Sequence, residues 1–400
     1  MIDGKTVVAI IPARGGSQGI PRKNVLPIAG KPLLAHVVGE ALASRVVDRV
    51  LVSTDNPEIA EVARRFGAEV VDRPAALSGS KASSESALMH VLETLKAAEN
   101  YEPDILVFLQ CTSPLTSSQD IDGTVEALIR ERADTALAVT DFHYFLWTVE
   151  DGNAVGVNHD KRVRPMRQDR EPQFLETGAV YVMRVDGFKS TQYRFFGKTA
   201  LYETPKERCF EIDDPPDLIA AEALLRSNRK GDQLRLLPKT IGALIFDFDG
   251  VFTDNRVIVN QDGVESVACD RSDGWGLGRL KRLGVPMLVL STEKNPVVRA
   301  RCGKLGLTCL QGVDHKWPAL QGWLSEHAID PETAVYVGND VNDLECLQNV
   351  GCGVTPLDAY PQAKSGARIV LEAKGGRGAV REIVELVLAR MGKKDEIIGG

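Results

Sequence analysis

The chain has 400 residues, of which 44% are hydrophobic and 26% charged, with 48 Lys and Arg against 55 Asp and Glu. This composition is typical of a folded globular protein and excludes collagen-like, fibrous and disordered chains. The net charge of −7 argues against a nucleic-acid or membrane partner, and no apolar run reaches the roughly 20 residues that span a bilayer. Seven cysteines without a CxxC pair indicate reduced thiols. We therefore expect a cytoplasmic protein of two or three domains.

Short apolar runs alternate with helical patterns through the first half of the chain. The patterns predict amphipathic helices at 32–43, 58–66, 85–98 and 117–131, and buried strands at 7–11, 49–53, 104–110, 135–140 and 179–183. Such alternation predicts a mostly parallel sheet covered on both faces, with ligands at the carboxyl ends of the strands. We expect an α/β domain at 1–228 with a doubly wound sheet.

The pattern lapses into polar and basic residues near 227–240, and a second alternating series begins at Ile241. Strands are predicted at 241–246, 285–290, 307–311 and 334–337, with outer strands at 351–354 and 369–371. A helical stretch follows each of the first four strands, so this part is also α/β. We therefore expect a linker at 229–240, a second α/β domain at 241–392 and a tail at 393–400.

A glycine-rich loop with basic residues follows the first predicted strand. It reads IPARGGSQGIPRKN from Ile11 to Asn24. Glycines let backbone N–H groups approach a phosphate closely, and Arg14, Arg22 and Lys23 add positive charge. The loop matches neither GxxxxGK[ST] nor GxGxxG, and it suits a nucleoside triphosphate. The alternative is a glycine-rich connection whose basic residues are merely solvated.

Five further motifs follow this loop. They are VSTD at 52–55, RP at 73–74, LQCTSP at 109–114, TGAVY at 177–181 and EID at 211–213. In content and order they resemble the N-acylneuraminate (CMP-sialic acid) cytidylyltransferases, relatives of the CMP-Kdo synthetases, over about residues 5–225. The resemblance implies that CTP and a nine-carbon 2-keto sugar acid form a CMP-sugar and pyrophosphate, with Mg²⁺ as cofactor.

Carried over residue by residue, the resemblance implies two sets of binding residues. CTP would be bound by Arg14, Ser17, Lys23, Asn24, Arg73 and Ser84, of which Arg14 and Lys23 are also catalytic. The sugar acid would be bound by Gln110, Thr112, Arg167, Tyr181, Phe195 and Phe196. Arg167 suits the sugar carboxylate because a planar guanidinium holds two oxygens, although it also belongs to a cluster of solvated cations. The adjacent aromatics Phe195 and Phe196 could equally belong to the core.

Two acids in the last of these motifs are candidate metal ligands. Glu211 and Asp213 stand one residue apart in a segment expected to be extended, so their side chains share one side. Two such carboxylates can hold Mg²⁺ against triphosphate oxygens. The alternative is a pair of acids in the turn before the next helix. Departures from the family pattern, such as Cys111, leave N-acetylneuraminate, Kdn, legionaminate and pseudaminate all open as the sugar acid.

A pair of aspartates follows the first predicted strand of the second domain, in the segment DFDGVFTD from Asp247 to Asp254. Asp247 and Asp249 lie on one side of the loop, where one can attack phosphorus while the other shuttles a proton. This pattern resembles the haloacid dehalogenase phosphatases, specifically the small, largely capless type that hydrolyses Kdo 8-phosphate, over about 241–392.

This second resemblance implies that Ser291 binds phosphoryl oxygens, that Lys316 neutralises the aspartyl phosphate, and that Mg²⁺ is held by Asp247, Asp249, Asn339 and Asp343. Asn339 stands where these phosphatases usually have an aspartate, so weaker metal binding is expected. The domain would act on a nonulosonate 9-phosphate, or it is a non-catalytic oligomerisation module. The resemblance suggests a homo-oligomer, a dimer or a tetramer. We expect the hairpin-like stretch 256–267 to pack against another subunit.

Overall fold

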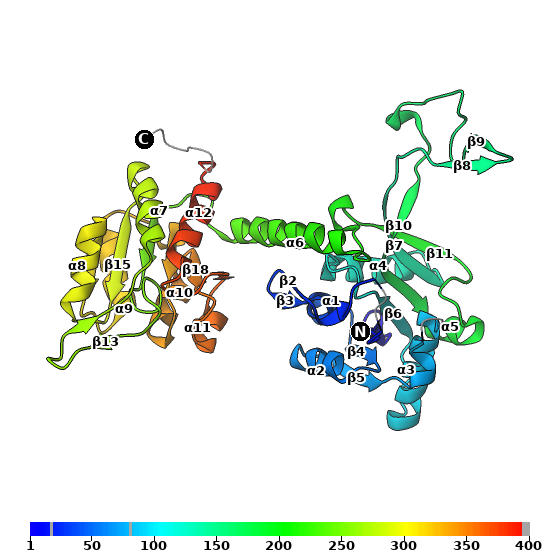
Figure 1. Ribbon diagram of the computed structural model, residues 1–400, viewed down its shortest axis with the longest axis horizontal. Coiled ribbons are helices and arrows are strands. Elements are labelled where there is room, and N and C mark those ends of the chain that lie inside the picture. The colour runs from blue at the N-terminus through cyan, green and yellow to red at the C-terminus, as the bar shows by residue number, and fades with distance from the viewer. Residues whose placement is uncertain (17–18, 80–81, 394–400) are drawn as a thin grey trace. The chain divides into compact units, whose positions relative to one another are not determined.

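The computed structural model describes residues 1–16, 19–79 and 82–393. The chain forms two compact units, Met1–Ser227 (unit 1) and Asn228–Gly400 (unit 2). Each unit is built on one large sheet with helices around it (Figure 1). The predicted fold class, two α/β domains, is confirmed. In the described ranges, no helix combines the length and apolar character that crossing a bilayer requires.

Unit 1 contains a seven-stranded mixed sheet in the order β11-β7-β10-β6-β1-β4-β5. Its strands are β1 Val7–Pro12, β4 Arg49–Thr54, β5 Glu69–Asp72, β6 Ile105–Leu109, β7 Thr135–Asp141, β10 Phe174–Arg184 and β11 Thr199–Glu203. Only β10 runs antiparallel to its neighbours β6 and β7. The five predicted strands are present. Strands β5 and β11 lie at the two edges, where short half-exposed segments have a weak pattern.

Side chains at the helix starts explain where several helices of unit 1 begin. These helices are α1 Leu33–Ala43, α2 Pro57–Arg65, α3 Ser84–Glu99, α4 Ser118–Arg130, α5 Val185–Thr191 and α6 Pro215–Leu236. Asn56 caps α2, and Ser117 with Asp120 forms a capping box at α4. Residues 229–236 of the expected linker belong to α6, so that stretch is helical.

Two hairpins and several 3₁₀ turns complete unit 1. The hairpins pair β2 Pro27–Ile28 with β3 Lys31–Pro32, and β8 Trp147–Glu150 with β9 Asn153–Gly156. The 3₁₀ turns are η1 Lys23–Val25, η2 Ala75–Leu77, η3 Arg167–Asp169 and η4 Lys206–Arg208. We call residues 142–173, between β7 and β10, the arm. Figure 1 shows the β8–β9 hairpin of the arm projecting away from the sheet of unit 1.

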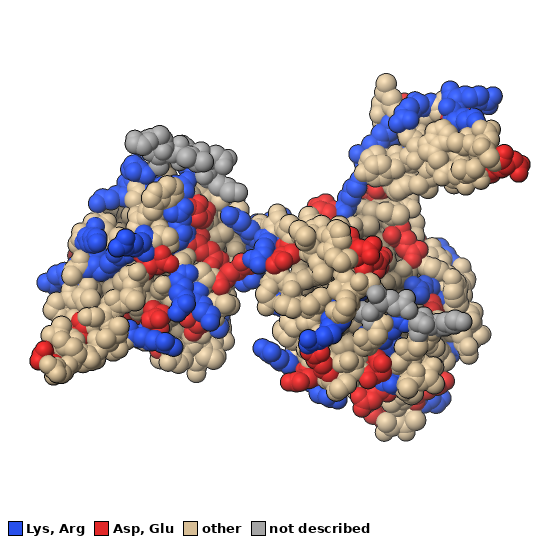
Figure 2. Space-filling model, viewed as in Figure 1, with Lys and Arg blue, Asp and Glu red and all other residues tan. Residues whose placement is uncertain are grey.

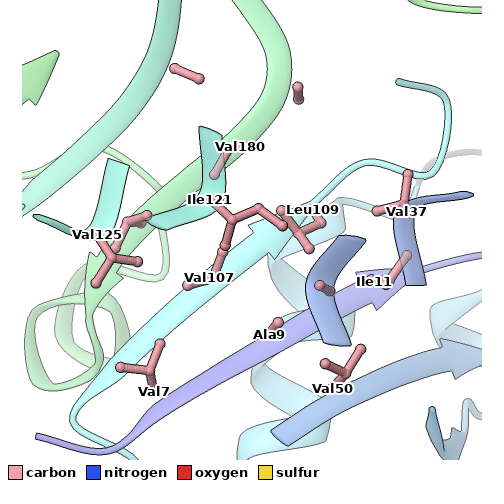
Figure 3. Close-up of a cluster of buried hydrophobic side chains, with 14 of the residues drawn as sticks. Val7, Ala9, Ile11, Val37, Val50, Val107, Leu109, Ile121, Val125 and Val180 are labelled. Carbon is pink, nitrogen blue, oxygen red and sulfur yellow. The ribbon is translucent and has the colours of Figure 1, made fainter. Parts of the chain in front are cut away.

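The central strand β1 contributes to both core layers of unit 1, because successive side chains point to opposite faces. Val8 and Ile10 pack into one layer with α3. The opposite layer is shown in Figure 3 and includes Val7, Ala9 and Ile11 of β1, Val107 and Leu109 of β6, and Ile121 and Val125 of α4. Burial on both faces explains why β1 is an unbroken apolar run.

Unit 2 contains a six-stranded, wholly parallel sheet in the order β16-β15-β12-β17-β18-β19. Its strands are β12 Ala243–Phe246, β15 Met287–Ser291, β16 Thr308–Gln311, β17 Ala334–Val337, β18 Cys352–Thr355 and β19 Ile369–Val370. All six were predicted, and β12, β15, β17 and β18 are fully buried, whereas the edge strand β16 is partly exposed. A separate hairpin pairs β13 Ile258–Val259 with β14 Glu265–Ser266.

Within the described residues, six helices lie wholly in unit 2, which also contains the last residues of α6. They are α7 Arg271–Arg282, α8 Pro296–Leu305, α9 Lys316–Glu326, α10 Leu344–Asn349, α11 Pro361–Gly366 and α12 Ala379–Arg390, with 3₁₀ turns η5 Pro331–Thr333 and η6 Val341–Asp343. The central strand β12 divides its side chains between two layers as β1 does. Leu244 and Phe246 face the layer that includes α12, and Ala243 and Ile245 face the layer that includes α9.

Truncation of Ile121 tests the role of the layer in Figure 3. Its side chain is fully buried, so Ile121→Ala should lower the free energy of unfolding of unit 1 by about 2–5 kcal/mol. Ile219→Ala is the control because Ile219 is 75% exposed. Urea unfolding followed by circular dichroism measures both. Equal stability of the two variants would contradict the assignment of Ile121 to the core.

Candidate active sites

A cavity of about 530 Å³ opens where strands of unit 1 end. Its wall comes from the segments that follow β1, β5 and β6, the start of α3 and the segment before α6. The structure brings together here eight of the expected site residues: Arg14, Lys23, Asn24, Arg73, Ser84, Gln110, Thr112 and Asp213. Ser17 lies outside the described residues.

Asn24 holds the loop after β1 in place. Its side chain is 5% exposed, donates from Nδ2 to the carbonyl oxygen of Arg14 at 3.0 Å and accepts at Oδ1 from the thiol of Cys111 at 2.8 Å. The Arg14 guanidinium in turn donates to the carbonyl oxygen of Gly79 at 3.0 Å. Both polar groups of Asn24 thus have protein partners, so this residue positions Arg14 next to the cavity.

Lys23 connects this loop to the acidic segment before α6. Its Nζ donates to the carbonyl oxygen of Ile212 at 2.6 Å and lies 3.4 Å from Asp213 Oδ1. Gly19 also lies against this segment, because a Cβ there would stand only 2.5 Å from the carbonyl oxygen of Asp213. Any larger residue at position 19 would therefore push the loop and the segment apart. The close packing puts cations and carboxylates on one wall of the cavity.

Arg73 is a buried cation at the same cavity, with 8% of its surface exposed. Its Nε donates to Ser53 Oγ at 3.2 Å and its Nη2 to the carbonyl oxygen of Ser53. Burial lowers the pKa of Arg73 from its ordinary value, and the charge of Asp55 opposes this shift. The guanidinium remains charged and is held rigidly beside the ligand space.

Glu211 and Asp213 flank the buried side chain of Ile212, so both carboxylates point outward from the same segment, as predicted for an extended one. Glu211 Oε1 accepts from Gln110 Nε2 at 3.1 Å. Partial desolvation and the charge of Asp213 raise the pKa of Glu211. A cation between these acids would offset that repulsion, so the pair fits a divalent ion. Among described residues, no group of three or more His, Cys, Asp or Glu forms a metal centre.

An aromatic layer stands behind the cavity. Tyr181 is 3% exposed and stacks on Phe108, with ring centroids 5.3 Å apart, and Phe108 lines the cavity. Phe195 meets the edge of Tyr181 at 6.0 Å. The guanidinium of Arg194 lies over both Phe108 and Tyr181, at 5.0 Å and 4.7 Å, and donates from Nε to Glu85 Oε1 at 2.7 Å. Arg194 and Glu85 were missed by sequence reasoning, and their only signal is adjacency to Phe195 and Ser84.

Three expected sugar-acid residues do not line the cavity in this chain. Tyr181 stacks on Phe108, and Phe195 contacts the edge of Tyr181. Phe196 packs on Gly187 and belongs to the same core cluster. These placements are those of core residues. They supply the rigid support for the cavity wall and leave Gln110 and Thr112 as the expected sugar-binding residues that reach it.

Arg167 also lies away from this cavity. It sits in the arm with 65% of its side chain exposed, and it pairs with Asp141. It borders two other cavities, of about 540 and 460 Å³, together with Arg170 and His143. Basic side chains gather on the arm (Figure 2). Within one chain the structure therefore does not bring Arg167 to Gln110 and Thr112.

The expected catalytic residues of unit 2 meet at the carboxyl edge of its sheet. Asp247 follows β12, Ser291 ends β15 and Lys316 begins α9. Lys316 Nζ lies 2.8 Å from Asp247 Oδ1 and 2.7 Å from Asp343 Oδ1, and its side chain is 1% exposed. Burial and the charge of Asp343 raise the pKa of Asp247, and Lys316 opposes this shift. Ser291 Oγ accepts from the N–H of Glu293 at 3.1 Å, so its hydroxyl proton can be donated to a ligand.

Asp343 positions other groups of this site. Its Oδ1 accepts from Lys316 and from the hydroxyl of Tyr336 at 2.6 Å, and its Oδ2 accepts from the N–H groups of Asn339 at 2.9 Å and Asp340 at 3.2 Å. Four donors therefore occupy both oxygens of the carboxylate. Asp343, an expected metal ligand, is not among the oxygens next to the side-chain amide of Asn339, which belong to Asp247 and Asp249. Tyr336 was missed because a tyrosine inside a buried strand looks like ordinary core.

The amide of Asn339 faces the two aspartates of the DFDG segment. Its head lies 3.1 Å from Asp247 Oδ2 and 2.8 Å from the carbonyl oxygen of Asp249. Gly250, which has a φ of +77°, makes room, because a Cβ there would stand 2.0 Å from this amide. Carboxylate, carbonyl and amide oxygens are ligands that Mg²⁺ prefers, so this position fits a divalent cation.

The side chain of Asp249 points elsewhere. Its Oδ1 lies 3.4 Å from Thr253 Oγ1, and burial followed by the charge of Glu293 raises the pKa of Asp249. The backbone oxygen of Asp249 therefore lies at the Asn339 amide, and its carboxyl group lies beside Thr253.

Unit 1 gathers cations of a glycine-rich loop around a cavity, and unit 2 gathers buried aspartates and a lysine at the edge of its sheet. Residues 8–239 match the family model described as Cytidylyltransferase. The chain belongs to this cytidylyltransferase family, and unit 2 is a haloacid dehalogenase-like domain.

Some similar proteins cover nearly the whole chain, and others cover only part of it. The N-acylneuraminate cytidylyltransferase of Oncorhynchus mykiss is 31% identical over 395 residues, which are 96% of this chain and 88% of that protein. The 3-deoxy-D-manno-octulosonate 8-phosphate phosphatase KdsC of Escherichia coli is 36% identical over 162 residues, 40% of this chain and 86% of that protein. The corresponding phosphatase of Moraxella catarrhalis, solved with magnesium, phosphate and KDO, is 29% identical, with a TM-score of 0.39 over 40% of this chain and 93% of that chain.

Removal of the buried lysine tests the charge arrangement of unit 2. Lys316→Met leaves the buried carboxylates of Asp247 and Asp343 facing each other without a cation, which should destabilise unit 2 by about 3–5 kcal/mol. Lys304→Met removes an exposed lysine of α8 and serves as the control. Differential scanning calorimetry of the full chain measures both. A Lys316 variant as stable as the control would show that the cluster is uncharged.

Proposed function

We propose that unit 1 transfers the cytidylyl group of CTP to a nine-carbon 2-keto sugar acid, giving a CMP-nonulosonate and pyrophosphate. The observation that carries this proposal is the single cavity lined by Arg14, Lys23 and Arg73 together with Gln110 and Thr112. Likeness to a protein named N-acylneuraminate cytidylyltransferase over 96% of the chain supports the class of sugar acid. The test is incubation with CTP, Mg²⁺ and a panel of nonulosonates, each free and 9-phosphorylated.

In this reaction the anomeric hydroxyl oxygen attacks the α-phosphorus of CTP and the hydroxyl proton passes to solvent. The bond between the α-phosphorus and the oxygen that bridges to the β-phosphorus breaks, which releases pyrophosphate. Arg14 and Lys23 stabilise the negative charge of the triphosphate and of the leaving pyrophosphate. Glu211 and Asp213 would hold Mg²⁺, which supplies further positive charge to the triphosphate oxygens. Gln110 and Thr112 orient the sugar acid, and alignment of the two substrates supplies much of the rate.

Neutral replacements in the glycine-rich loop test the nucleotide site. Arg14→Ala and Lys23→Ala should each slow CTP-dependent pyrophosphate release about 10²-fold, which corresponds to about 3 kcal/mol. Lys31→Ala, which removes an exposed lysine outside the cavity, should leave the rate unchanged. Wild-type turnover in both loop variants would mean that the loop is only a structural turn.

Asp213→Asn tests the metal assignment in unit 1. Loss of one carboxylate should raise the Mg²⁺ concentration that gives half-maximal pyrophosphate release, because fewer negative ligands bind the cation more weakly. Asp213 is 75% exposed at its side chain, so the fold should be preserved. Asp214→Asn, at the neighbouring position, is the matched control. An Mg²⁺ titration identical to that of the control would exclude this role for Asp213.

For unit 2 we propose hydrolysis of a nonulosonate 9-phosphate. Asp247 would attack the phosphorus while Asp249 protonates the leaving sugar oxygen, and water would then hydrolyse the aspartyl phosphate, which releases phosphate and restores Asp247. Ser291 would bind phosphoryl oxygens, and Lys316 would neutralise the aspartyl phosphate. Likeness over 86% of a Kdo 8-phosphate phosphatase supports this class of substrate. The second candidate is a non-catalytic oligomerisation module, which the substitution at Asn339 favours. Phosphate release from a 9-phosphate, lost in Asp247→Asn, separates the two.

We further propose that the protein works as a homo-oligomer. The β13–β14 hairpin is tied to its own unit through β14, where Glu265 Oε2 accepts from Asn295 Nδ2 at 2.9 Å. Its apolar side chains Ile258, Val259 and Val264 are 56–68% exposed. Exposed apolar side chains on a projecting hairpin suit contact with another subunit. A capless phosphatase also gains a cover for its site from a neighbouring chain.

Deletion of this hairpin tests the oligomer. Replacement of residues 257–266 by a short glycine linker should lower the mass measured by light scattering and reduce phosphate release. CTP-dependent pyrophosphate release should persist, because the transferase site lies in unit 1. An unchanged mass after deletion would rule out the hairpin as an interface.

A further inference from the structure

We infer that the side-chain amide of Asn339 stabilises the metal site of unit 2 both with and without a cation. Without a cation, its nitrogen donates hydrogen bonds to Asp247 and Asp249. When a divalent cation binds, the amide rotates and its oxygen becomes a ligand. The inference rests on the proposed metal position of unit 2 and is independent of the phosphatase substrate. It predicts a domain that stays folded without metal and binds divalent ions more weakly than an aspartate site would.

The geometry provides the bridge. The amide head of Asn339 lies 3.1 Å from Asp247 Oδ2 and 2.8 Å from the carbonyl oxygen of Asp249, and both of these atoms are acceptors. Only an N–H donor satisfies two acceptors at these distances, so Nδ2 faces them. Asn339 and Asp247 are each 5% exposed. Buried acceptors that lack a donor are costly, so the bridge stabilises the site.

The local charge favours an amide at this position. Lys316 is the cation in contact with Asp247, and the same ammonium group also serves Asp343. An aspartate at position 339 would add a third buried carboxylate to this cluster, and uncompensated buried charge destabilises a fold strongly. Asn339 adds no charge, so the cluster contains two carboxylates and one ammonium group.

The same side chain can serve a cation. The nitrogen and oxygen of an amide occupy nearly identical positions, so a half turn about the last side-chain bond puts Oδ1 where Nδ2 was. It would then join Asp247 Oδ2 and the Asp249 carbonyl oxygen as an oxygen ligand. The missing Cβ of Gly250 leaves the space in which the amide sits in either orientation. Because asparagine carries no negative charge, the site binds the cation less tightly than it would with an aspartate at position 339.

The test compares wild type, Asn339→Asp and Asn339→Leu as full chains, with Asn342→Asp as matched control. Asn342 lies three residues further along the same loop and is exposed, so its replacement makes the same charge change away from the oxygens. Binding of Mn²⁺ is followed by the electron paramagnetic resonance signal of the free ion. Unfolding of unit 2 is followed by calorimetry in EDTA and in Mn²⁺. The unit 1 site contributes equally in all variants.

We expect Asn339→Asp to bind Mn²⁺ at unit 2 about tenfold more tightly than wild type. In EDTA its unfolding temperature should fall by about 4 °C or more, and Mn²⁺ should restore it, since the cation compensates the added carboxylate. Asn339→Leu should lose stability in EDTA without recovery in Mn²⁺, because leucine neither donates nor coordinates. Wild type and Asn342→Asp should change little between the two conditions.

Two results would overturn the inference. One is an Asn339→Asp variant with wild-type Mn²⁺ affinity or wild-type stability in EDTA. The other is a wild-type protein whose own unfolding temperature falls by about 4 °C or more when Mn²⁺ is replaced by EDTA. This second measurement needs no variant, so it decides even if a variant fails to fold. Phosphate release from a nonulosonate 9-phosphate is measured in parallel. Its absence with the expected metal and stability pattern counts against the phosphatase proposal alone.

Discussion

Both sites depend on one constraint: the hydrogen-bond ladder of each sheet continues for one residue past the ends of its central strands. In unit 1 the N–H of Ala13 donates to the carbonyl oxygen of Ser53 at 2.9 Å, and that of Gln110 donates to Ala179 at 3.2 Å. In unit 2 the N–H of Asp247 donates to Val337 at 2.8 Å. These bonds hold the first residues of each functional loop to the sheet. The backbone positions of the side chains that follow are therefore fixed, and these side chains lose little conformational entropy when they bind a ligand.

The two units differ in how tightly their charged side chains are paired and buried. In unit 2, Lys316 is 1% exposed and already bound by two carboxylates, so its position is set by folding and does not wait for a ligand. In unit 1 the pairs are looser: Lys23 is 3.4 Å from Asp213, and the Asp213 side chain is 75% exposed. A pair with one exposed partner at this distance contributes little to stability. Lys23 is also held by its 2.6 Å hydrogen bond to the carbonyl oxygen of Ile212, so under the proposed function it would exchange only Asp213 for a triphosphate.

The helices and strands, and the motifs of unit 2, could be predicted from the sequence. Unbroken apolar runs such as β1 and β12 identify central strands because both of their faces are buried. Residues close in sequence, such as Asp247 and Asp249, could be placed together from local pattern alone.

What the sequence could not provide were contacts across long separations. The pair of Arg194 and Glu85 spans 109 residues, and neither residue lies in a recognisable motif. The reversed direction of β10 depends on its partners, and the strand itself looks like any other buried strand. Of the four donors to Asp343, only Lys316 is distant in sequence, and no motif links these two residues.

The same strand-end position supports two chemistries because the sign of the charge placed there differs. Cations after β1 and β5, such as Arg14 and Arg73, attract and neutralise a highly charged triphosphate but offer no nucleophile, so the attacking oxygen must come from the second substrate. Aspartates after β12 offer a nucleophile and an acid but repel an anionic phosphate ester. In the proposed phosphatase reaction, unit 2 would therefore need Lys316 and a divalent cation beside Asp247 before such a substrate could approach. In the proposed transferase reaction, unit 1 would need its cation chiefly to complete the binding of CTP.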